Sequence, residues 1–251
     1  MNKRKIRKLG EEIVSIFGAV NVECILFHGS ILFNPQTPPQ DADFVIVLRR
    51  KKEDDCSELR RLVTRSRLVQ VPIHLHLIYL EELPVNADFF SIHTCGAFFA
   101  CHLRQAETIY GENIFDKLVG PSDYQLQLSL LQKVQQYTFQ LRNLVFKPGK
   151  ASEGELLWAR KKSIVMLKDL LLSSGILIQE EARIIRESMD RFPQFSAEER
   201  IFLEELSRPW VSSRSEAKRR HFMSRCLWVH ERAYEIMRTR IASTEKCRFL
   251  S

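Results

Sequence analysis

Apolar residues follow two different spacings along this chain, and the spacing changes near residue 120. Before that point, short continuous apolar runs alternate with segments in which every third or fourth residue is apolar. The runs 24–27, 44–48 and 71–80 predict β-strands, whereas the periodic segments 6–17 and 56–63 predict helices. Strands that alternate with helices in this way predict a sheet packed by helices.

Beyond residue 120 only the helical spacing remains. The periodic segments are separated by residues rich in Pro, Gly or Ser, and they predict helices over 124–146, 153–173, 180–190, 197–207 and 215–241. Ser152 is predicted to be a helix N-cap, and Ser196 with Glu199 to form a capping box. The pattern therefore predicts two domains, a mixed α/β (α+β) domain over 1–120 and an all-α helical bundle over 121–251.

The composition is that of a globular protein. Of the 251 residues, 45% are hydrophobic and 27% are charged, which excludes a wholly disordered chain. No apolar run approaches the roughly 18 residues that a membrane-spanning helix needs. The six cysteines include no CxxC pair, which indicates reduced, mostly buried thiols rather than a disulfide framework. We therefore expect a cytoplasmic protein with no targeting segment and no membrane partner.

The basic charge is concentrated in the second half of the chain. The sequence has 38 basic and 31 acidic residues, of which 15 each lie in 1–120, so the whole excess of seven positive charges lies in 121–251. A basic lobe beside a neutral one suggests a partner that carries phosphate. On the charge alone, a solvated basic surface is the favoured interpretation.

The strongest chemical pattern is a Gly-Ser pair that is followed, after ten residues, by two aspartates. Gly29 lets the backbone approach a phosphate closely, and Ser30 offers a hydroxyl donor at the expected start of a helix. Asp41 and Asp43 stand two apart on the next predicted strand, so their side chains share one face. Two such carboxylates repel each other unless a divalent cation such as Mg²⁺ bridges them and also binds substrate phosphates. Nucleotidyl transfer by the two-metal route requires this combination.

These residues resemble the signature of the nucleotidyltransferase superfamily that includes DNA polymerase β, and most of all its small, minimal and antibiotic-modifying members. The signature is hG[GS], a loop and [DE]h[DE]h, and the resemblance extends over residues 5–120. It implies a nucleotidyltransferase fold followed by a helical domain that binds the acceptor. It also implies that Gly29 and Ser30 bind ATP or another nucleoside triphosphate, and that Asp41 and Asp43 are catalytic ligands of Mg²⁺ in a two-metal site. The implied reaction transfers a nucleoside monophosphate to a hydroxyl acceptor and releases pyrophosphate.

The superfamily has a third carboxylate on a later strand, and this chain has no acid in the corresponding run. The position falls on His74 or His76, depending on the alignment, and both histidines share one face. Neutral imidazole can accept a proton near pH 7, but it is a poorer Mg²⁺ ligand than a carboxylate. Glu81 or Glu82, at the end of the strand, could substitute. We expect an enzyme; the alternative is a degenerate, non-catalytic member that binds a nucleotide or a partner as a regulator.

The acceptor stays open between a small molecule and an RNA. Basic side chains on two predicted helices could bind a triphosphate or RNA: Arg160, Lys161, Lys162, Lys168 and the run 218–221. A cationic antibiotic would instead need carboxylates, which four residues could supply: Glu153, Glu155, Glu204 and Glu205. Arg225 and His230 loosely fit the Rx4–6H pattern of helical ribonucleases, although a buried core histidine is the favoured interpretation of His230.

Overall fold

The computed structural model describes residues 3–28, 42–65, 73–83, 103–118, 122–208 and 215–248. The chain divides into two compact units, Met1–Ser122 and Asp123–Ser251. The first contains a sheet and its covering helices, and the second is entirely helical in the part that the structure describes.

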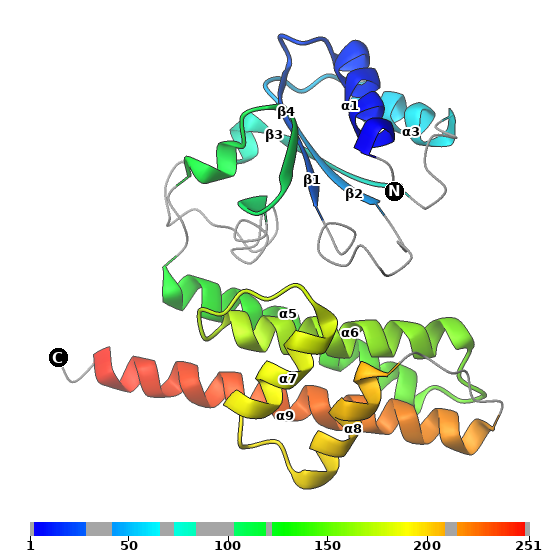
Figure 1. The fold of residues 1–251 in the computed structure, drawn as a ribbon, viewed down its shortest axis with the longest axis vertical. Helices are drawn as coiled ribbons and strands as arrows, with labels where there is room; N and C mark the ends of the chain where they lie inside the picture. Colours follow the sequence, from blue (N-terminus) through cyan, green and yellow to red (C-terminus); the bar gives the residue numbers. More distant parts are fainter. Residues whose placement is uncertain are drawn as a thin grey trace. The chain divides into compact units, whose positions relative to one another are not determined.

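The sheet of the first unit has four strands in the order β3-β2-β1-β4 (Figure 1). Their bounds are β1 Val22–His28, β2 Ala42–Leu48, β3 Ile73–Tyr79 and β4 Glu107–Gly111. β1 is antiparallel to β2 and to β4, whereas β2 and β3 are parallel. The end of β1 therefore meets the starts of the other three strands at one edge of the sheet.

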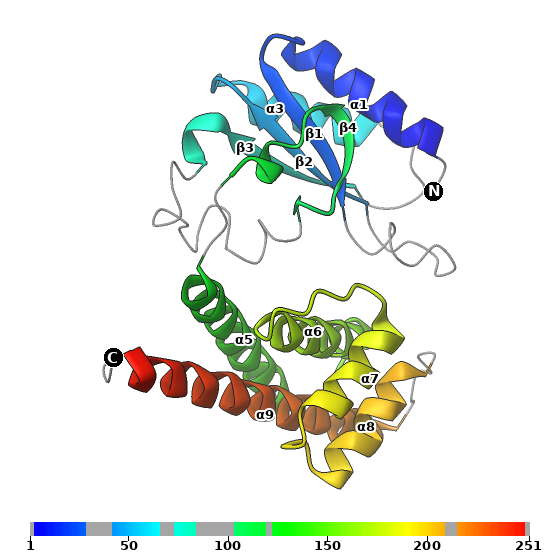
Figure 2. The ribbon, with the colours of Figure 1, turned by 60° about the vertical axis from the view of Figure 1, so that its left-hand side comes forward.

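One face of the sheet is covered by the helices α1 (Lys3–Phe17) and α3 (Asp55–Arg65), as Figures 1 and 2 show. Alternate strand residues point to this face, and they pack against the apolar stripe of α1. The largest contributions come from Phe27 and Phe44, whose ring centroids lie 5.0 Å apart and which are almost fully buried. Because side chains alternate along each strand, the residues between these point to the opposite face of the sheet.

The opposite face is apolar in its middle and polar at the edge where β2 and β3 begin. Leu26, Val45 and Val47 pack there against Leu103 and Phe115, which flank β4 in the sequence. Two short 3₁₀ helices, η1 (Leu80–Glu82) and η3 (Ile114–Asp116), belong to the same unit. Towards the edge the same face carries histidine and aspartate side chains in place of the aliphatic ones.

The second unit consists of five helices over its described residues. They are α5 (Asp123–Phe146), α6 (Glu153–Leu172), α7 (Glu181–Arg191), α8 (Ala197–Ser207) and α9 (Glu216–Arg248). The long helix α9 packs along α5 and α6, and α7 and α8 complete the bundle against α6 and α9 (Figure 2). Within the described residues, no helix is long and apolar enough to cross a membrane.

The predicted fold class is confirmed: a mixed sheet with helices is followed by a helical bundle. The two predicted helix caps are also present, because Ser152 and Ser196 each accept from the backbone N–H three residues later and form reciprocal capping boxes. Cys24 and Cys226 are buried free thiols, and burial raises the pKa of the first to about 11 and of the second to about 12. These two cysteines are therefore core residues, as the sequence predicted.

Candidate active site

Three residues form a row across β1, β2 and β3 at the polar edge of the sheet. Asp43 on β2 is the ladder partner of His28 on β1 and of His74 on β3. Ladder partners point to the same face, so one carboxylate is flanked by an imidazole on each side. The sheet hydrogen bonding fixes this order, because a slip of one residue would turn the side chains of a strand to the helix-covered face.

The contact between Asp43 and His74 is direct. His74 Nδ1 lies 3.2 Å from Asp43 Oδ1, within hydrogen-bonding distance. The ring can donate to the carboxylate in the neutral tautomer that carries its proton on Nδ1, and also as the charged ring. The side chain of His74 is 54% exposed and that of Asp43 is 20% exposed. The pair is therefore held by the sheet yet open to solvent, which a substrate-binding site needs.

His76 lies on the same face but deeper along the strand. Its ladder partner on β2 is Val45, and its ring centroid lies 6.0 Å from that of His28. The register therefore places His74, rather than His76, directly beside Asp43.

Three of the residues in the predicted motif, Gly29, Ser30 and Asp41, lie outside the described residues. Asp43 supplies one carboxylate, the ligand type that a hard cation such as Mg²⁺ prefers, whereas the neighbouring imidazole of His74 is not such a ligand. Over the ranges of the chain that the structure describes, no three His, Cys, Asp or Glu side chains are grouped so as to hold a metal ion. Of the two aspartates predicted to bind Mg²⁺, the described residues therefore include only Asp43.

Glu81 and Glu82 lie at the opposite end of β3 from His74. They belong to the 3₁₀ turn that follows the strand, and Glu82 accepts a hydrogen bond from the backbone N–H of Tyr79 at 2.9 Å. Tyr79 is the ladder partner of Leu48, the last residue of β2, while Asp43 is near the start of that strand. The capping role of Glu82 explains this acid without a catalytic function.

His28 is a site residue that the sequence prediction missed. The predicted strand ended at residue 27, whereas β1 continues through His28. The signal was present, because Cys24, Leu26 and His28 alternate along the strand and the first two face the side opposite α1. Extending that alternation by one step places His28 on the same face of the sheet as Asp43.

The ribonuclease hypothesis for Arg225 and His230 is not supported by their positions. His230 is completely buried, its Nε2 lies 3.2 Å from Ser163 Oγ, and burial lowers its pKa to about 3. Arg225 is used elsewhere, in an ion pair with Glu205 at 2.8 Å. A histidine inside the bundle cannot reach an RNA backbone, so His230 is a core residue.

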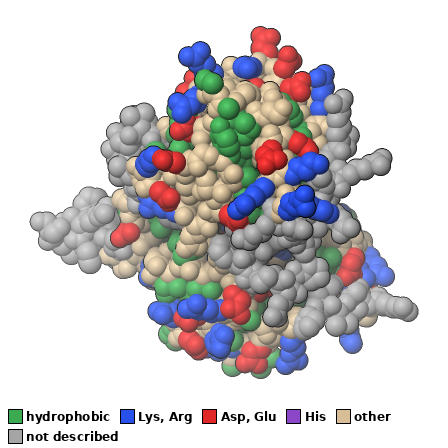
Figure 3. All heavy atoms as spheres, turned by 45° about the horizontal axis from the view of Figure 1, so that its top comes forward, with side chains coloured by type: hydrophobic (Ala, Val, Ile, Leu, Met, Phe, Trp, Pro, Cys, Tyr) green, Lys and Arg blue, Asp and Glu red, His purple; other side chains and the backbone are tan. Residues whose placement is uncertain are grey.

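Most of the basic side chains predicted to bind phosphate or RNA have partners within the helical unit. Arg160 pairs with Glu181 and the carbonyl of Leu206, and Arg219 pairs with Glu153 and the carbonyl of Ala151. Burial lowers the pKa of Lys168 to about 8. On the face drawn in Figure 3, Lys and Arg side chains are interspersed with Asp and Glu. The basic side chains with these contacts therefore stabilise the helical bundle.

Three of the four acids predicted for a cationic acceptor, namely Glu153, Glu155 and Glu205, are engaged in the same way. Glu155 caps α6 and pairs with Lys147, and these contacts lower its pKa to about 2. Glu205 pairs with Arg225, as described above. Glu204 is exposed on α8. These contacts account for Glu155 and Glu205 as structural residues.

Comparison with known proteins shows a shared fold. No protein-family model matches the sequence, and no curated protein matches it by sequence. Among solved structures, the chain is similar to spectinomycin adenyltransferase AAD(9) from Enterococcus faecialis, crystallised with ATP and spectinomycin. The TM-score is 0.63 at 12% sequence identity, over 93% of this chain and 99% of the other. The predicted resemblance to the nucleotidyltransferase superfamily is thereby supported at the level of the fold.

Proposed function

We propose that the protein is a Mg²⁺-dependent nucleotidyltransferase that transfers a nucleoside monophosphate from ATP or another nucleoside triphosphate to a hydroxyl group of a small-molecule acceptor. The observation that carries the proposal is the Asp43–His74 contact of 3.2 Å at the polar edge of this sheet. It brings one carboxylate of the predicted signature next to a group that can accept a proton. The similarity to an adenyltransferase that binds ATP and an antibiotic supports the same reaction type.

The nucleotide is assigned to the end of β1 and the start of β2. Gly29 and Ser30 follow His28 directly in the chain, and they hold the triphosphate through backbone N–H groups and the Ser30 hydroxyl. Asp41 and Asp43 would hold Mg²⁺, which would neutralise charge on the phosphates and on the departing pyrophosphate. Of these two aspartates, Asp43 is the one that lies beside His74.

His74 takes the place of the third carboxylate as the proton acceptor. With its proton on Nδ1, the ring donates to Asp43 Oδ1 and keeps Nε2 as an acceptor for the proton of the attacking hydroxyl. The acceptor oxygen then forms a bond to the α-phosphorus, and the bond between that phosphorus and the pyrophosphate oxygen breaks in line. His76 is assigned a supporting role, because its strand partner is Val45 rather than Asp43.

A small molecule is favoured over RNA as the acceptor. The bases that could bind an RNA backbone, such as Arg160 and Arg219, already pair with acids and carbonyls of their own unit. The solved structure with the same fold binds spectinomycin, which is a small molecule. Both observations support a compact hydroxyl-bearing acceptor.

The second candidate is a non-catalytic nucleotide-binding regulator, which the imidazole in place of the third carboxylate favours. Two measurements on the full chain separate the candidates: equilibrium binding of ATP with Mg²⁺, and release of pyrophosphate across a panel of hydroxyl acceptors. The enzyme proposal predicts acceptor-dependent pyrophosphate release that Asp43→Asn abolishes and the surface control Asp116→Asn retains. Binding of ATP without turnover on any acceptor would instead favour the regulator.

A further inference from the structure

A pocket of about 270 Å³ lies between α8 and α9 of the helical unit. Ile201 and Phe202 of α8 line it on one side, and Trp228 and Val229 of α9 line it on the other. Phe202 and Val229 are buried, but Ile201 is 56% and Trp228 49% exposed. Two large apolar side chains therefore face solvent on opposite sides of one concave site, an arrangement typical of small-molecule pockets.

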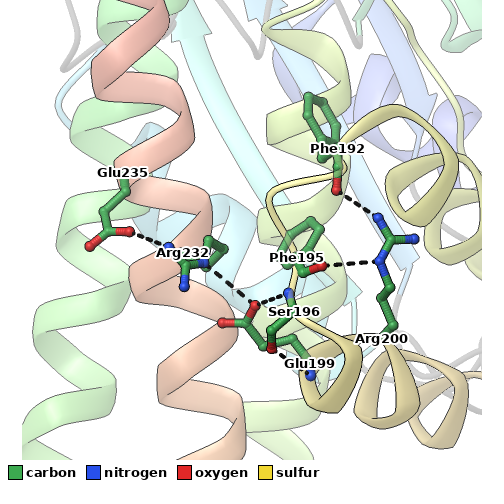
Figure 4. Close-up of polar contacts among 7 residues, drawn as sticks. All are labelled: Phe192, Phe195, Ser196, Glu199, Arg200, Arg232 and Glu235. Carbon is green, nitrogen blue, oxygen red and sulfur yellow. Dashed lines mark hydrogen bonds and ion pairs between the residues drawn. The ribbon is translucent and has the colours of Figure 1, made fainter.

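The α8 side of the pocket is held rigidly by polar contacts (Figure 4). Glu199, which is 8% exposed, accepts from the backbone N–H of Ser196 at 2.7 Å and contacts Arg232 of α9 at 3.5 Å. Arg200 donates to three carbonyls at the end of α7 and in the turn that follows it, at 2.7–3.1 Å: those of Met189, Phe192 and Phe195. These bonds fix the start of α8 against α7 and α9, so the pocket is formed before any ligand arrives.

Among the Arg and Glu side chains that line the pocket, one carboxylate has no described partner; the exposed His221 of α9 also lines the pocket. Arg225 is neutralised by Glu205 at 2.8 Å, and its guanidinium lies 4.5 Å from the centre of the Phe202 ring. Glu199 is engaged by Arg232. Glu198 also lines the pocket, and it makes no ion pair or hydrogen bond with any residue in the described ranges. The lining thus combines an exposed indole with an uncompensated negative charge.

We propose that this α8–α9 pocket binds a small organic cation with a compact aromatic or branched apolar body. The apolar body packs between Ile201 and Trp228, and the ammonium group pairs with Glu198 while it contacts the indole face. Tryptophan is the best aromatic partner for a cation, and a nearby carboxylate adds to the attraction. An anion is disfavoured because Glu198 repels it and Arg225 is already paired. The inference does not depend on the proposed nucleotidyl transfer.

A matched pair of probes tests the charge preference. 2-Phenylethylammonium and 2-phenylethanol have almost the same size and shape, but only the first carries a positive charge. The chain has three tryptophans, so the indole N–H signals of the ¹⁵N-labelled full chain are easily followed, and Trp228→Phe identifies the signal of Trp228. The proposal predicts a saturable shift of that signal by the ammonium probe, with affinity for the alcohol lower by about fivefold.

Variants on the same helix provide the control. Glu198→Gln is expected to weaken binding of 2-phenylethylammonium by about fivefold, whereas Glu204→Gln, an exposed acid of α8 that does not line the pocket, leaves it unchanged. Equal affinities for the two probes, or equal effects of the two variants, would overturn the cation assignment. An absent or non-saturating shift would overturn the site itself. So would concentration-dependent self-association that Trp228→Phe abolishes, because a second copy would then cover the pocket.

Discussion

Asp43 Oδ1 lies 3.2 Å from His74 Nδ1, and the two residues are direct partners in the parallel β2–β3 ladder. The contact therefore follows from the strand register rather than from the chance orientation of two surface side chains. It places an imidazole directly beside one of the two carboxylates that the sequence predicts to bind Mg²⁺. The proposed chemistry depends on whether this imidazole accepts the proton of the attacking hydroxyl.

Replacing Asp43 by asparagine removes the charge but keeps the shape of the side chain. Because the side chain is partly exposed and bonded only at the sheet edge, the free energy of unfolding should change by less than about 1 kcal/mol. Pyrophosphate release should fall by at least about a hundredfold, since the ligand of Mg²⁺ is lost. Initial rates and urea unfolding of Asp43→Asn and Asp116→Asn check this expectation. Activity retained by Asp43→Asn would remove this residue from the site.

Substitutions of His74 separate its role from that of His76. His74→Ala should lower the rate by about 10²–10⁴-fold, the usual contribution of a positioned proton acceptor. His74→Asp should recover the activity that alanine loses, because a carboxylate can accept the proton and also bind Mg²⁺. The matched control is His76→Ala, two residues further along the same face of β3, and it should lower the rate by less than about tenfold. A larger loss for His76→Ala than for His74→Ala would reverse the assignment.

A glycine beside β1 tests the construction of the sheet. Gly111 at the end of β4 has a φ of +70°, and a Cβ added there would overlap the carbonyl oxygen of Glu23. Gly18 has a φ of +80° but nothing near its added Cβ. Gly111→Ala should therefore destabilise the first unit by about 2 kcal/mol or more, and Gly18→Ala by about 1 kcal/mol. Chemical denaturation measures both, and equal losses would contradict the close approach of β4 to β1.

The buried His230 makes stability depend on pH. Its pKa is lowered to about 3 in the fold because burial disfavours the charged ring, whereas in the unfolded chain it is near 6.5. The unfolded state therefore binds a proton as pH falls below 6.5 while the folded state does not, and the free energy of unfolding decreases. Between pH 7 and pH 5 the loss is about 2 kcal/mol.

Two variants on α9 isolate this effect. His230→Gln should remove most of the loss between pH 7 and pH 5, whatever its effect on stability at pH 7. His221→Gln, which replaces an exposed histidine of the same helix, should keep it. Unfolding curves in urea at the two pH values supply the comparison. Identical pH dependence in His230→Gln and the unsubstituted protein would show that another group is responsible.

The strands and helices could be predicted because their patterns are strong and local. The run Phe44–Leu48 is apolar at every position, as a strand buried on both faces must be, and it forms most of β2. The start of α8 could be predicted from four consecutive residues, because Ser196 and Glu199 form a capping box there. Such features depend on neighbours in the chain, so periodicity and capping rules are sufficient to find them.

The arrangement of the site could be predicted only in part, because it depends on pairing between distant strands. The sequence places His74 and His76 on one face, but only the register shows which of them is beside Asp43. His28 was missed because the Gly-Ser pair that follows it suggested an earlier end to the strand. The interior position of His230 likewise depends on how α6 and α9 pack, since its hydrogen bond is to Ser163 on another helix.

The most direct test of nucleotidyl transfer is the fate of the α-phosphate. ATP labelled with ³²P at the α position is incubated with the full chain, Mg²⁺ and hydroxyl acceptors, in parallel with ATP labelled at the γ position. The proposed mechanism predicts that an acceptor gains the α label and never the γ label, and that Asp43→Asn transfers neither. Transfer of the γ label, or transfer of the α label by Asp43→Asn at an unchanged rate, would contradict it.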